Sequence, residues 1–160
     1  MTTHTHRPVL RVRVPTNRAY SSARNYGKPA PMDGLNEIVG QNRTNRQVGA
    51  RIERENVEHV ARFVRAKMHA IGYAPMTETD RQRAVVYVRI REPHDGRDVA
   101  NVLGGVLKYT LDALTARNKH GTGAIWDDST KWIAKLVPQI VVDPENVGVE
   151  IVVIPLEEKS

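Results

Sequence analysis

The hydrophobic and polar positions along the chain change period several times, and each period predicts a secondary-structure element. Residues 8–14 alternate apolar and basic side chains, which is typical of a strand with one buried face, and Pro15 ends this pattern. Residues 48–71 carry apolar side chains three and four positions apart, which predicts a helix that stops at Gly72. The predicted buried stripe of this helix is Val57, Val60, Ala61, Val64, Met68 and Ile71.

The second half of the chain adds strands and one more helix. Residues 84–90 are almost uninterruptedly apolar, which predicts a central strand. A helix is predicted over 99–116, an extended stretch over 131–142 and a last strand over 147–154, with a hairpin connection at 143–146. The order β-α-β-α-β-β predicts an α+β fold with a mixed sheet and two main helices. The predicted core stripe of the second helix is Leu103, Val106, Leu107, Thr110, Leu111 and Leu114.

Two stretches depart from these regular patterns. Residues 16–47 are irregular, rich in Asn, Ser, Gly and Pro, and dotted with arginines. We interpret them as a long basic loop, open to disorder when no ligand is bound, because long loops inside compact domains are usually functional or mobile. Gly104 and Gly105 would each weaken a helix interior by roughly 1 kcal/mol relative to Ala. They therefore predict either a break in the second helix or the close approach of another backbone.

The length and composition of the chain limit its class. A chain of 160 residues is long enough for one domain with a core, so we expect a single domain over residues 1–160. The absence of cysteine excludes disulfides, thiol nucleophiles and cysteine-based zinc sites. The sequence has neither an apolar run of the ~18 residues that a membrane span needs nor an apolar N-terminal core typical of secretory signals. We therefore expect a cytoplasmic protein without a membrane partner.

Basic and acidic residues are distributed unevenly, although the net charge of the chain is only +6. Residues 1–91 carry 17 Lys and Arg against 7 Asp and Glu (+10), and residues 92–160 carry 7 against 11 (−4). A basic half favours a polyanionic partner, because each cation placed on a phosphate releases condensed counterions. An acidic half on the same domain suits a protein that grips a nucleic-acid backbone and holds a cation against it. Solvated arginine-rich faces without a ligand are the alternative.

Two acidic positions are candidates for chemistry because of where they fall. Asp98 lies just past the predicted central strand, at the start of the second helix, and Asp127 and Asp128 follow a short apolar run. Carboxylates at strand and loop ends can converge at one edge of a sheet, and hard oxygen ligands are what Mg²⁺ requires. In a nuclease such a metal polarises the phosphodiester and orients water. From the residues alone, an N-cap at Asp98 and a turn at Asp127 and Asp128 stay open as alternatives.

The predicted second helix also carries a candidate polar face. At 100° per residue, Asn101, Lys108 and Asp112 fall on one side, opposite the leucine stripe, and would form a polar wall beside a phosphate. An ordinary ion pair between Lys108 and Asp112 on an exposed face is equally consistent with this spacing. Trp126 and Trp132, which flank the aspartate pair, are interpreted as core or dimer contacts rather than as base-stacking platforms.

Cofactor-binding patterns are missing from the sequence. The six histidines are scattered, and no pair of them has an i,i+4 metal-binding spacing within a predicted helix. No glycine-rich loop of the kind that binds mononucleotide or dinucleotide phosphates is present. We therefore expect no small-molecule cofactor, and the candidate chemistry is limited to carboxylates and basic side chains.

Three short elements of the second half follow one another in a fixed order. They are Arg97-Asp-Val-Ala-Asn101, Leu107-Lys-Tyr-Thr-Leu-Asp-Ala-Leu114 and Gly123-Ala-Ile-Trp-Asp-Asp-Ser129. Together they resemble the RusA family of Holliday junction resolvases, which shows Arg-Asp-x-Asp/Ala-Asn, Lys-x-x-x-Asp-Ala/Gly-Leu and Gly-x-x-x-Asp-Asp-Ser/Ala in this order. The first strand and the Asn- and Arg-rich loop of that family are similar to residues 9–46.

The resemblance implies a RusA-like fold and a homodimer that binds four-way junctions and other branched DNA. It implies paired nicks that depend on Mg²⁺, with Mn²⁺ able to substitute, and a phage or prophage product in a bacterial host. Asp98 and Asp128 would be metal ligands, with Asp127 as a supporting carboxylate, and Lys108 would stabilise charge on the scissile phosphate. Asp112 would be structural. The expected DNA contacts are Arg18, Arg24, Arg43, Arg46, Arg51, Arg97 and Asn101.

The chain departs from the family pattern at one position of the first motif. Well-known members have a second aspartate two residues after the first, where this chain has Ala100, and Lys108 lies about four residues further from Asp98 than in those members. Asp95 is a candidate to supply the missing ligand. A second hypothesis is therefore a non-catalytic DNA-junction-binding protein on the same fold, and a third is a phage scaffold or assembly protein whose basic charge is incidental.

Overall fold

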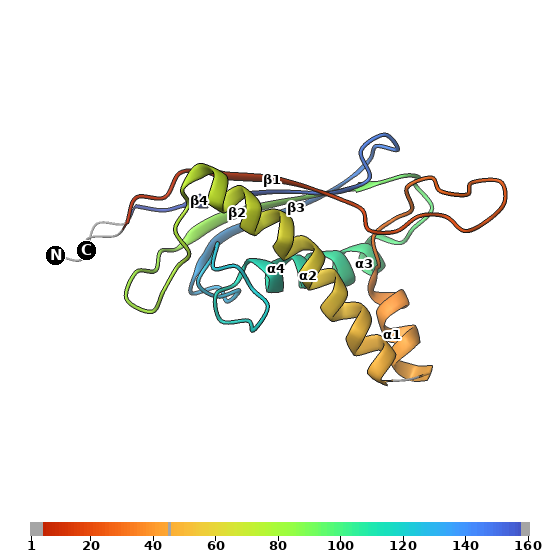
Figure 1. The fold of residues 1–160 in the computed structure, drawn as a ribbon, viewed down its shortest axis with the longest axis horizontal. Coiled ribbons are helices and arrows are strands. Elements are labelled where there is room, and N and C mark those ends of the chain that lie inside the picture. Colours follow the sequence, from red (N-terminus) through yellow and green to blue (C-terminus); the bar gives the residue numbers. More distant parts are fainter. Residues whose placement is uncertain (1–4, 45, 158–160) are drawn as a thin grey trace.

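The elements follow the predicted order, with one additional helix. The computed structural model describes residues 5–44 and 46–157, and Figure 1 shows a sheet with helices on one side. The strands are β1 (Leu10–Pro15), β2 (Ala84–Glu92), β3 (Ile133–Val142) and β4 (Gly148–Pro155). The helices are α1 (Leu35–Thr44), α2 (Arg46–Ile71), α3 (Val99–Val102), the π-helix η1 (Leu103–Leu107) and α4 (Lys108–Leu114). The last three segments are consecutive, and we call them together the 99–114 helix.

The strands form one mixed sheet in the order β1-β4-β2-β3. β2 and β3 run parallel, and β4 is antiparallel to both β1 and β2. The predicted α+β domain with a mixed sheet is therefore confirmed. The predicted hairpin at residues 143–146 is wrong, because β2 lies between β3 and β4. β4 takes the central place since Val149, Ile151 and Val153 are almost fully buried, whereas β3 is an edge strand that contains Pro138, which donates no N–H.

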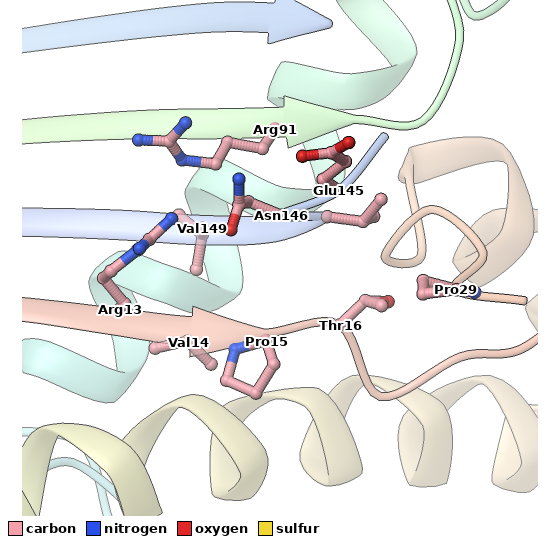
Figure 2. Close-up of a pocket in the computed structure, with 10 residues that line it drawn as sticks. Arg13, Val14, Pro15, Thr16, Pro29, Arg91, Glu145, Asn146 and Val149 are labelled. Atoms are coloured by element: carbon pink, nitrogen blue, oxygen red, sulfur yellow. The ribbon is translucent and has the colours of Figure 1, made fainter. Parts of the chain in front are cut away.

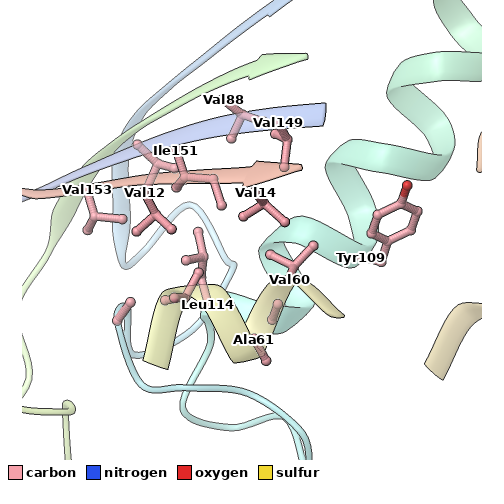
Figure 3. Close-up of a cluster of buried hydrophobic side chains, with 14 of the residues drawn as sticks. Val12, Val14, Val60, Ala61, Val88, Tyr109, Leu114, Val149, Ile151 and Val153 are labelled. Atoms are coloured by element: carbon pink, nitrogen blue, oxygen red, sulfur yellow. The ribbon is translucent and has the colours of Figure 1, made fainter. Parts of the chain in front are cut away.

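One face of the sheet packs against α2 and the 99–114 helix. The predicted alternation of β1 is confirmed, because Leu10, Val12 and Val14 are buried whereas Arg11 and Arg13 are exposed. Each fully buried Val or Leu side chain contributes roughly 1.5–3 kcal/mol, so this shared core fixes the helices on the sheet. Figure 3 shows side chains from β1, β2, β4, α2 and α4 that meet there, among them Val12, Val14, Val60, Val88, Leu114, Ile151 and Val153.

Helix α2 confirms the predicted amphipathic helix almost residue for residue. It begins two residues before the predicted start and ends at Ile71, and Gly72 follows with a φ of 69°, a conformation that glycine adopts without strain. Among the described residues, no helix combines the length and the apolar character that crossing a bilayer requires. The buried positions of α2 are Gly49, Asn56, Val57, Val60, Ala61, Val64 and Met68.

The prediction of a long loop over residues 16–47 is only half correct. Its first part is irregular, but its second part forms α1, which packs against α2 and η1. Ile38 of α1 is buried, and the backbone N–H of Asn36 donates to Oδ1 of Asn101 at 2.6 Å. The helix was missed because its sequence has a weak apolar pattern, so its stability comes from tertiary contacts rather than from local preference.

At Gly104 and Gly105 the 99–114 helix shows both features that the sequence predicted as alternatives, a break in the helix and the close approach of another backbone. The hydrogen bonding changes to a π-turn at η1, and the backbone of Gly34 lies against Gly105. A Cβ atom on Gly105 would lie 2.6 Å from the Cα of Gly34, closer than real Cβ contacts allow. The π-turn also rotates the helix, so the predicted core stripe is partly wrong: Leu103, Leu107 and Leu111 are only partly buried. The fully buried positions include Val102, Val106, Tyr109, Ala113 and Leu114.

Candidate functional site

Asp98 lies at the N-terminal end of the 99–114 helix and acts as its N-cap. Its carboxylate Oδ2 accepts a hydrogen bond from the backbone N–H of Asn101 at 3.3 Å. A carboxylate at this position satisfies a free N–H group and is also stabilised by the helix dipole. The N-cap alternative is thus what the structure shows, and the side chain remains exposed to solvent and to any ligand.

Asp127 and Asp128 lie at the other end of the same helix, in the segment that leads into β3. The Thr115 hydroxyl donates to the carbonyl of Trp126 at 2.9 Å, which holds this segment against the C-terminal end of the helix. Asp127 Oδ2 lies 3.7 Å from Nη1 of Arg117, and Asp128 is exposed. The pair is therefore available at the surface, with one cation beside it.

The expected convergence of Asp98 with Asp127 and Asp128 is not found within one chain. Asp98 follows β2 and the aspartate pair precedes β3, and these strands are parallel, so the two positions lie at opposite ends of the strand pair. The 99–114 helix that joins these ends spans about 24 Å. Within the described part of the chain, no three His, Cys, Asp or Glu side chains are grouped so as to hold a metal. A single chain therefore does not fit the three-carboxylate Mg²⁺ site.

The predicted polar face of Asn101, Lys108 and Asp112 is divided by the π-turn. Asn101 is buried and binds the first turn of α1, so it has a structural contact in place of a free amide. Lys108 is exposed, and its Nζ lies 3.4 Å from Oδ2 of Asp112, which is the i,i+4 pair left open by the sequence. Of the three side chains, only Lys108 is free to reach a phosphate.

Arg97, an expected DNA contact, is held by the protein itself. Its Nε lies 2.7 Å from Glu92 Oε1, its Nη1 lies 2.9 Å from Glu37 Oε1, and its Nη2 donates to the carbonyl of Met32. Burial lowers the pKa of Arg97, but the two carboxylates more than compensate and raise it above its ordinary value. With all its nitrogens engaged and 12% of the side chain exposed, this residue ties β2 to α1.

Arg18, also expected on DNA, belongs to a polar cluster that the sequence analysis missed. Its Nη2 lies 2.6 Å from Oδ2 of Asp33, which also accepts a hydrogen bond from Nδ2 of Asn56 at 2.9 Å. The hydrogen bond to Asp33 raises the pKa of Arg18. The Tyr109 hydroxyl donates to the carbonyl of Asp33 at 2.9 Å. The partners lie 15, 23 and 76 residues apart from Asp33 along the chain, so no local pattern could have revealed the cluster.

The other arginines that were expected to contact DNA differ in whether their side chains are exposed or already paired. Arg24 and Arg46 are exposed, and Arg51 lies 3.6 Å from Glu55 on the surface of α2, a weak pair that a phosphate can replace. The side chain of Arg43 lies outside the described residues. Further exposed arginines, which the analysis did not select, lie on the uncovered face of the sheet: Arg11, Arg13 and Arg89. The alternation of basic and apolar residues in β1 was the signal for two of them.

Trp126 and Trp132 enclose a cation instead of forming a closed core. The guanidinium carbon of Arg81 lies 5.5 Å from the ring centroid of Trp126 and 4.9 Å from that of Trp132. Such cation–π contacts contribute about 0.5–1 kcal/mol each at exposed sites. Both rings are partly exposed beside the aspartate pair. Their interpretation as dimer contacts stays a prediction.

A pocket of about 380 Å³ at the ends of β1, β2 and β4 does not fit an anion. Figure 2 shows Arg13, Arg91, Glu145 and Asn146 among its lining side chains. Arg91 is already paired at 2.7 Å with both Asp143 and Glu150, so the carboxylates offset the arginines. The pocket therefore lacks the excess positive charge that a phosphate site requires.

Comparison with known proteins finds no family model, no curated protein and no solved structure that matches this chain. The resemblance to the RusA family thus rests on the three ordered motifs and on the similarity of residues 9–46.

Proposed function

We propose that the protein is a Mg²⁺-dependent, structure-selective endodeoxyribonuclease that resolves Holliday junctions and other branched DNA as a homodimer. The order of the three motif elements supports this assignment. The observation that carries it is that Asp98 and the Asp127–Asp128 pair occupy the two ends of one helix. In a two-fold dimer with antiparallel helices, the Asp98 end of one subunit meets the aspartate pair of its partner. Two equivalent three-carboxylate sites result, one for each strand to be cut.

A row of partly buried leucines on one side of the 99–114 helix also supports such a dimer. Leu103, Leu107 and Leu111 are four residues apart and only partly buried. Leu136 and Ile140 of the edge strand β3 are also partly buried, and their register pairs them with buried residues of β2, on the same face of the sheet. Apolar side chains that keep part of their surface in solvent can be covered by a partner, because apolar surface patches often mark interaction sites. We call this surface the leucine strip; its members are Leu103, Leu107, Leu111, Leu136 and Ile140.

The proposed reaction is an in-line attack of water on phosphorus with cleavage of one phosphorus–oxygen bond. Asp98 of one subunit and Asp127 and Asp128 of its partner would hold Mg²⁺, which would polarise the phosphate and offset the charge on the leaving oxygen. Lys108, which is 65% exposed, exchanges its weak contact with Asp112 for the scissile phosphate and stabilises the charge that develops there. Ala100 is exposed and leaves the site one carboxylate short, and Asp95 is the exposed acid nearest in sequence that can replace it.

Mixed dimers test the shared site directly. Asp98→Asn and Asp128→Asn should each abolish cutting of a four-way junction in Mg²⁺ while binding stays equal or becomes tighter, because a carboxylate near phosphate is removed. When the two variants are mixed and allowed to exchange subunits, one intact site forms in each heterodimer, and nicking of a cruciform plasmid should return. A mixture of either variant with the Asp98→Asn, Asp128→Asn double variant is the matched control and should stay inactive. No rescue in the first mixture would contradict the shared site.

A non-catalytic junction-binding protein is the second candidate, favoured by Ala100 in place of a family carboxylate. The same assays separate the two functions. Binding of the four-way junction without cutting in Mg²⁺ or Mn²⁺, unchanged by Asp128→Asn, would support the second candidate. The absence of any salt-dependent DNA binding would contradict both and would favour an assembly protein with incidental charge.

A further inference from the structure

The irregular segment between β1 and α1 contains a short, well-bonded hairpin, which we call the 17–30 hairpin. The backbone N–H of Tyr20 donates to the carbonyl of Lys28 at 2.9 Å, and the N–H of Gly27 donates back to Tyr20 at 3.0 Å. At its base, the Thr16 hydroxyl donates to the carbonyl of Ala30 at 2.7 Å. The hairpin is thus fixed at both ends by bonds within the chain, and it projects beyond the sheet (Figure 1).

Tyr26 lies at the corner of the turn that closes this hairpin. The N–H of Lys28 donates to the carbonyl of Asn25 at 3.0 Å, and Gly27, the third residue of the turn, has a φ of 79°. A positive φ at this place is typical of a type II turn and explains the glycine. The second position of such a turn points its side chain outward. Tyr26 is 79% exposed, more than any other large apolar or aromatic side chain that the structure describes as exposed.

The surroundings of Tyr26 are basic and polar. Arg24 and Lys28 are exposed on the same hairpin, and residues 16–32 contain no Asp or Glu. Among the described residues, the side chains of Arg24, Tyr26 and Lys28 make no hydrogen bond, ion pair or ring contact. A protein-binding hot spot normally lies among further contacts that exclude water. The Tyr26 ring instead stands in solvent between two cations. A free aromatic face between two unpaired cations instead matches a nucleobase with a phosphate on either side.

We propose that the 17–30 hairpin binds an unpaired base at the branch point of DNA, with Tyr26 stacked on the base and Arg24 and Lys28 on the flanking phosphates. This inference rests on the proposed function. The hairpin follows β1, which runs parallel to β2, so it lies at the same end of the sheet as Asp98 (Figure 1). A base held there would place the branch beside one end of the proposed cutting site.

The test is binding of a synthetic four-way junction with 2-aminopurine at the branch point, measured without Mg²⁺, beside a linear duplex of equal length. Tyr26→Ala should weaken junction binding roughly tenfold, as loss of one stacked base does, and should change duplex binding less than twofold. It should also abolish the fluorescence change of 2-aminopurine on binding. Tyr26→Phe keeps the ring and should behave as the unaltered protein. Val9→Ala, at another exposed apolar position, is the matched control and should change nothing.

The outcomes separate this inference from the proposed function. If the protein binds and cuts the junction but Tyr26→Ala binds it as tightly as the unaltered protein, the hairpin inference is wrong and the nuclease stands. Equal losses on junction and duplex would also overturn it, because a stacked unpaired base cannot account for them. If the unaltered protein binds neither DNA, both proposals fail. The thermal unfolding of each variant should be unchanged, since the side chain lies in solvent.

Discussion

At the residue scale, the side chain with the most hydrogen bonds in the described part of the chain is that of Arg7, which holds the N-terminal segment to the 74–82 connection. Its Nε donates to the carbonyl of Ala74 at 2.7 Å, its Nη1 to Oε1 of Gln82 at 2.7 Å and its Nη2 to Oδ2 of Asp80 at 3.1 Å. The side chain is fully buried. Burial raises the pKa of Asp80, but hydrogen bonds from Thr5 and Arg7 outweigh it and lower the pKa to about 2.

Arg7→Ala should therefore lower the free energy of unfolding by about 3 kcal/mol, because acceptors on Ala74, Pro75, Asp80 and Gln82 lose their donor. The folded-state pKa of Asp80 lies below its unfolded value, so its stabilisation is complete above about pH 5 and is lost as the pH falls toward 2. The variant should lose less stability over this range than the unaltered protein. Urea unfolding at pH 7 and at pH 3 measures both effects. Arg11→Ala, an exposed arginine of β1, is the control and should cost under 0.5 kcal/mol.

At the scale of elements, the predictions succeeded where one period continued over many residues. Helix α2 and strands β1, β2 and β4 all have one apolar side, and local periodicity is enough to locate them. Helix α1 and the π-turn could not be found in this way. The first is stabilised by Asn101 and by packing on α2, and the second by the backbone of Gly34, and both partners lie far away in the sequence.

The contact between Gly105 and the backbone of Gly34 gives a prediction about how the 99–114 helix tolerates a side chain at this position. Gly105→Ala should lower the free energy of unfolding by about 1–3 kcal/mol, because the Cβ meets backbone that cannot move away. Gly104→Ala is the matched control: its Cβ would lie 3.0 Å from Cδ2 and 3.2 Å from Cβ of Leu35, and a shift of a few tenths of an ångström at this 39% exposed residue relieves both contacts. The control should be neutral or gain up to about 1 kcal/mol from helix propensity. Urea unfolding of the two variants should separate them, and equal stabilisation of both would contradict the close approach.

At the scale of the whole molecule, the sequence indicated the acidic residues but could not place them. Asp98 and the aspartate pair each lie beside a strand, and this suggested convergence at one edge of the sheet. Whether two strand ends meet depends on strand direction, and the parallel pairing of β2 with β3 separates them. The expected DNA contacts also fall into two groups, which the sequence could not tell apart. Arg97 and Arg18 look free in the sequence but bind Glu92 and Asp33. Arg24 and Arg46 remain exposed.

The leucine strip offers a test of the proposed dimer, which would bring the separated acidic residues together. Leu107 lies midway between Asp98 and the aspartate pair, so an antiparallel partner helix would cross there. If the proposed dimer forms, Leu107→Glu should convert it into a monomer, because two carboxylates would face each other across the two-fold axis in an apolar contact. The Leu107 side chain is only partly buried, so the new charge can reach water in the monomer and the fold should survive. Light scattering after gel filtration measures the change in mass.

The same variant should lose the proposed cutting of the four-way junction at least a hundredfold, since each proposed site takes carboxylates from both subunits. Its affinity for a linear duplex should fall far less, because the arginines proposed to hold the backbone belong to each chain separately. Val9→Glu places an equal charge at an exposed apolar position outside the strip and should leave mass and cutting unchanged. A monomeric Leu107→Glu variant that still cuts would mean that one chain suffices. The acidic residues at the two ends of the helix would then have separate roles.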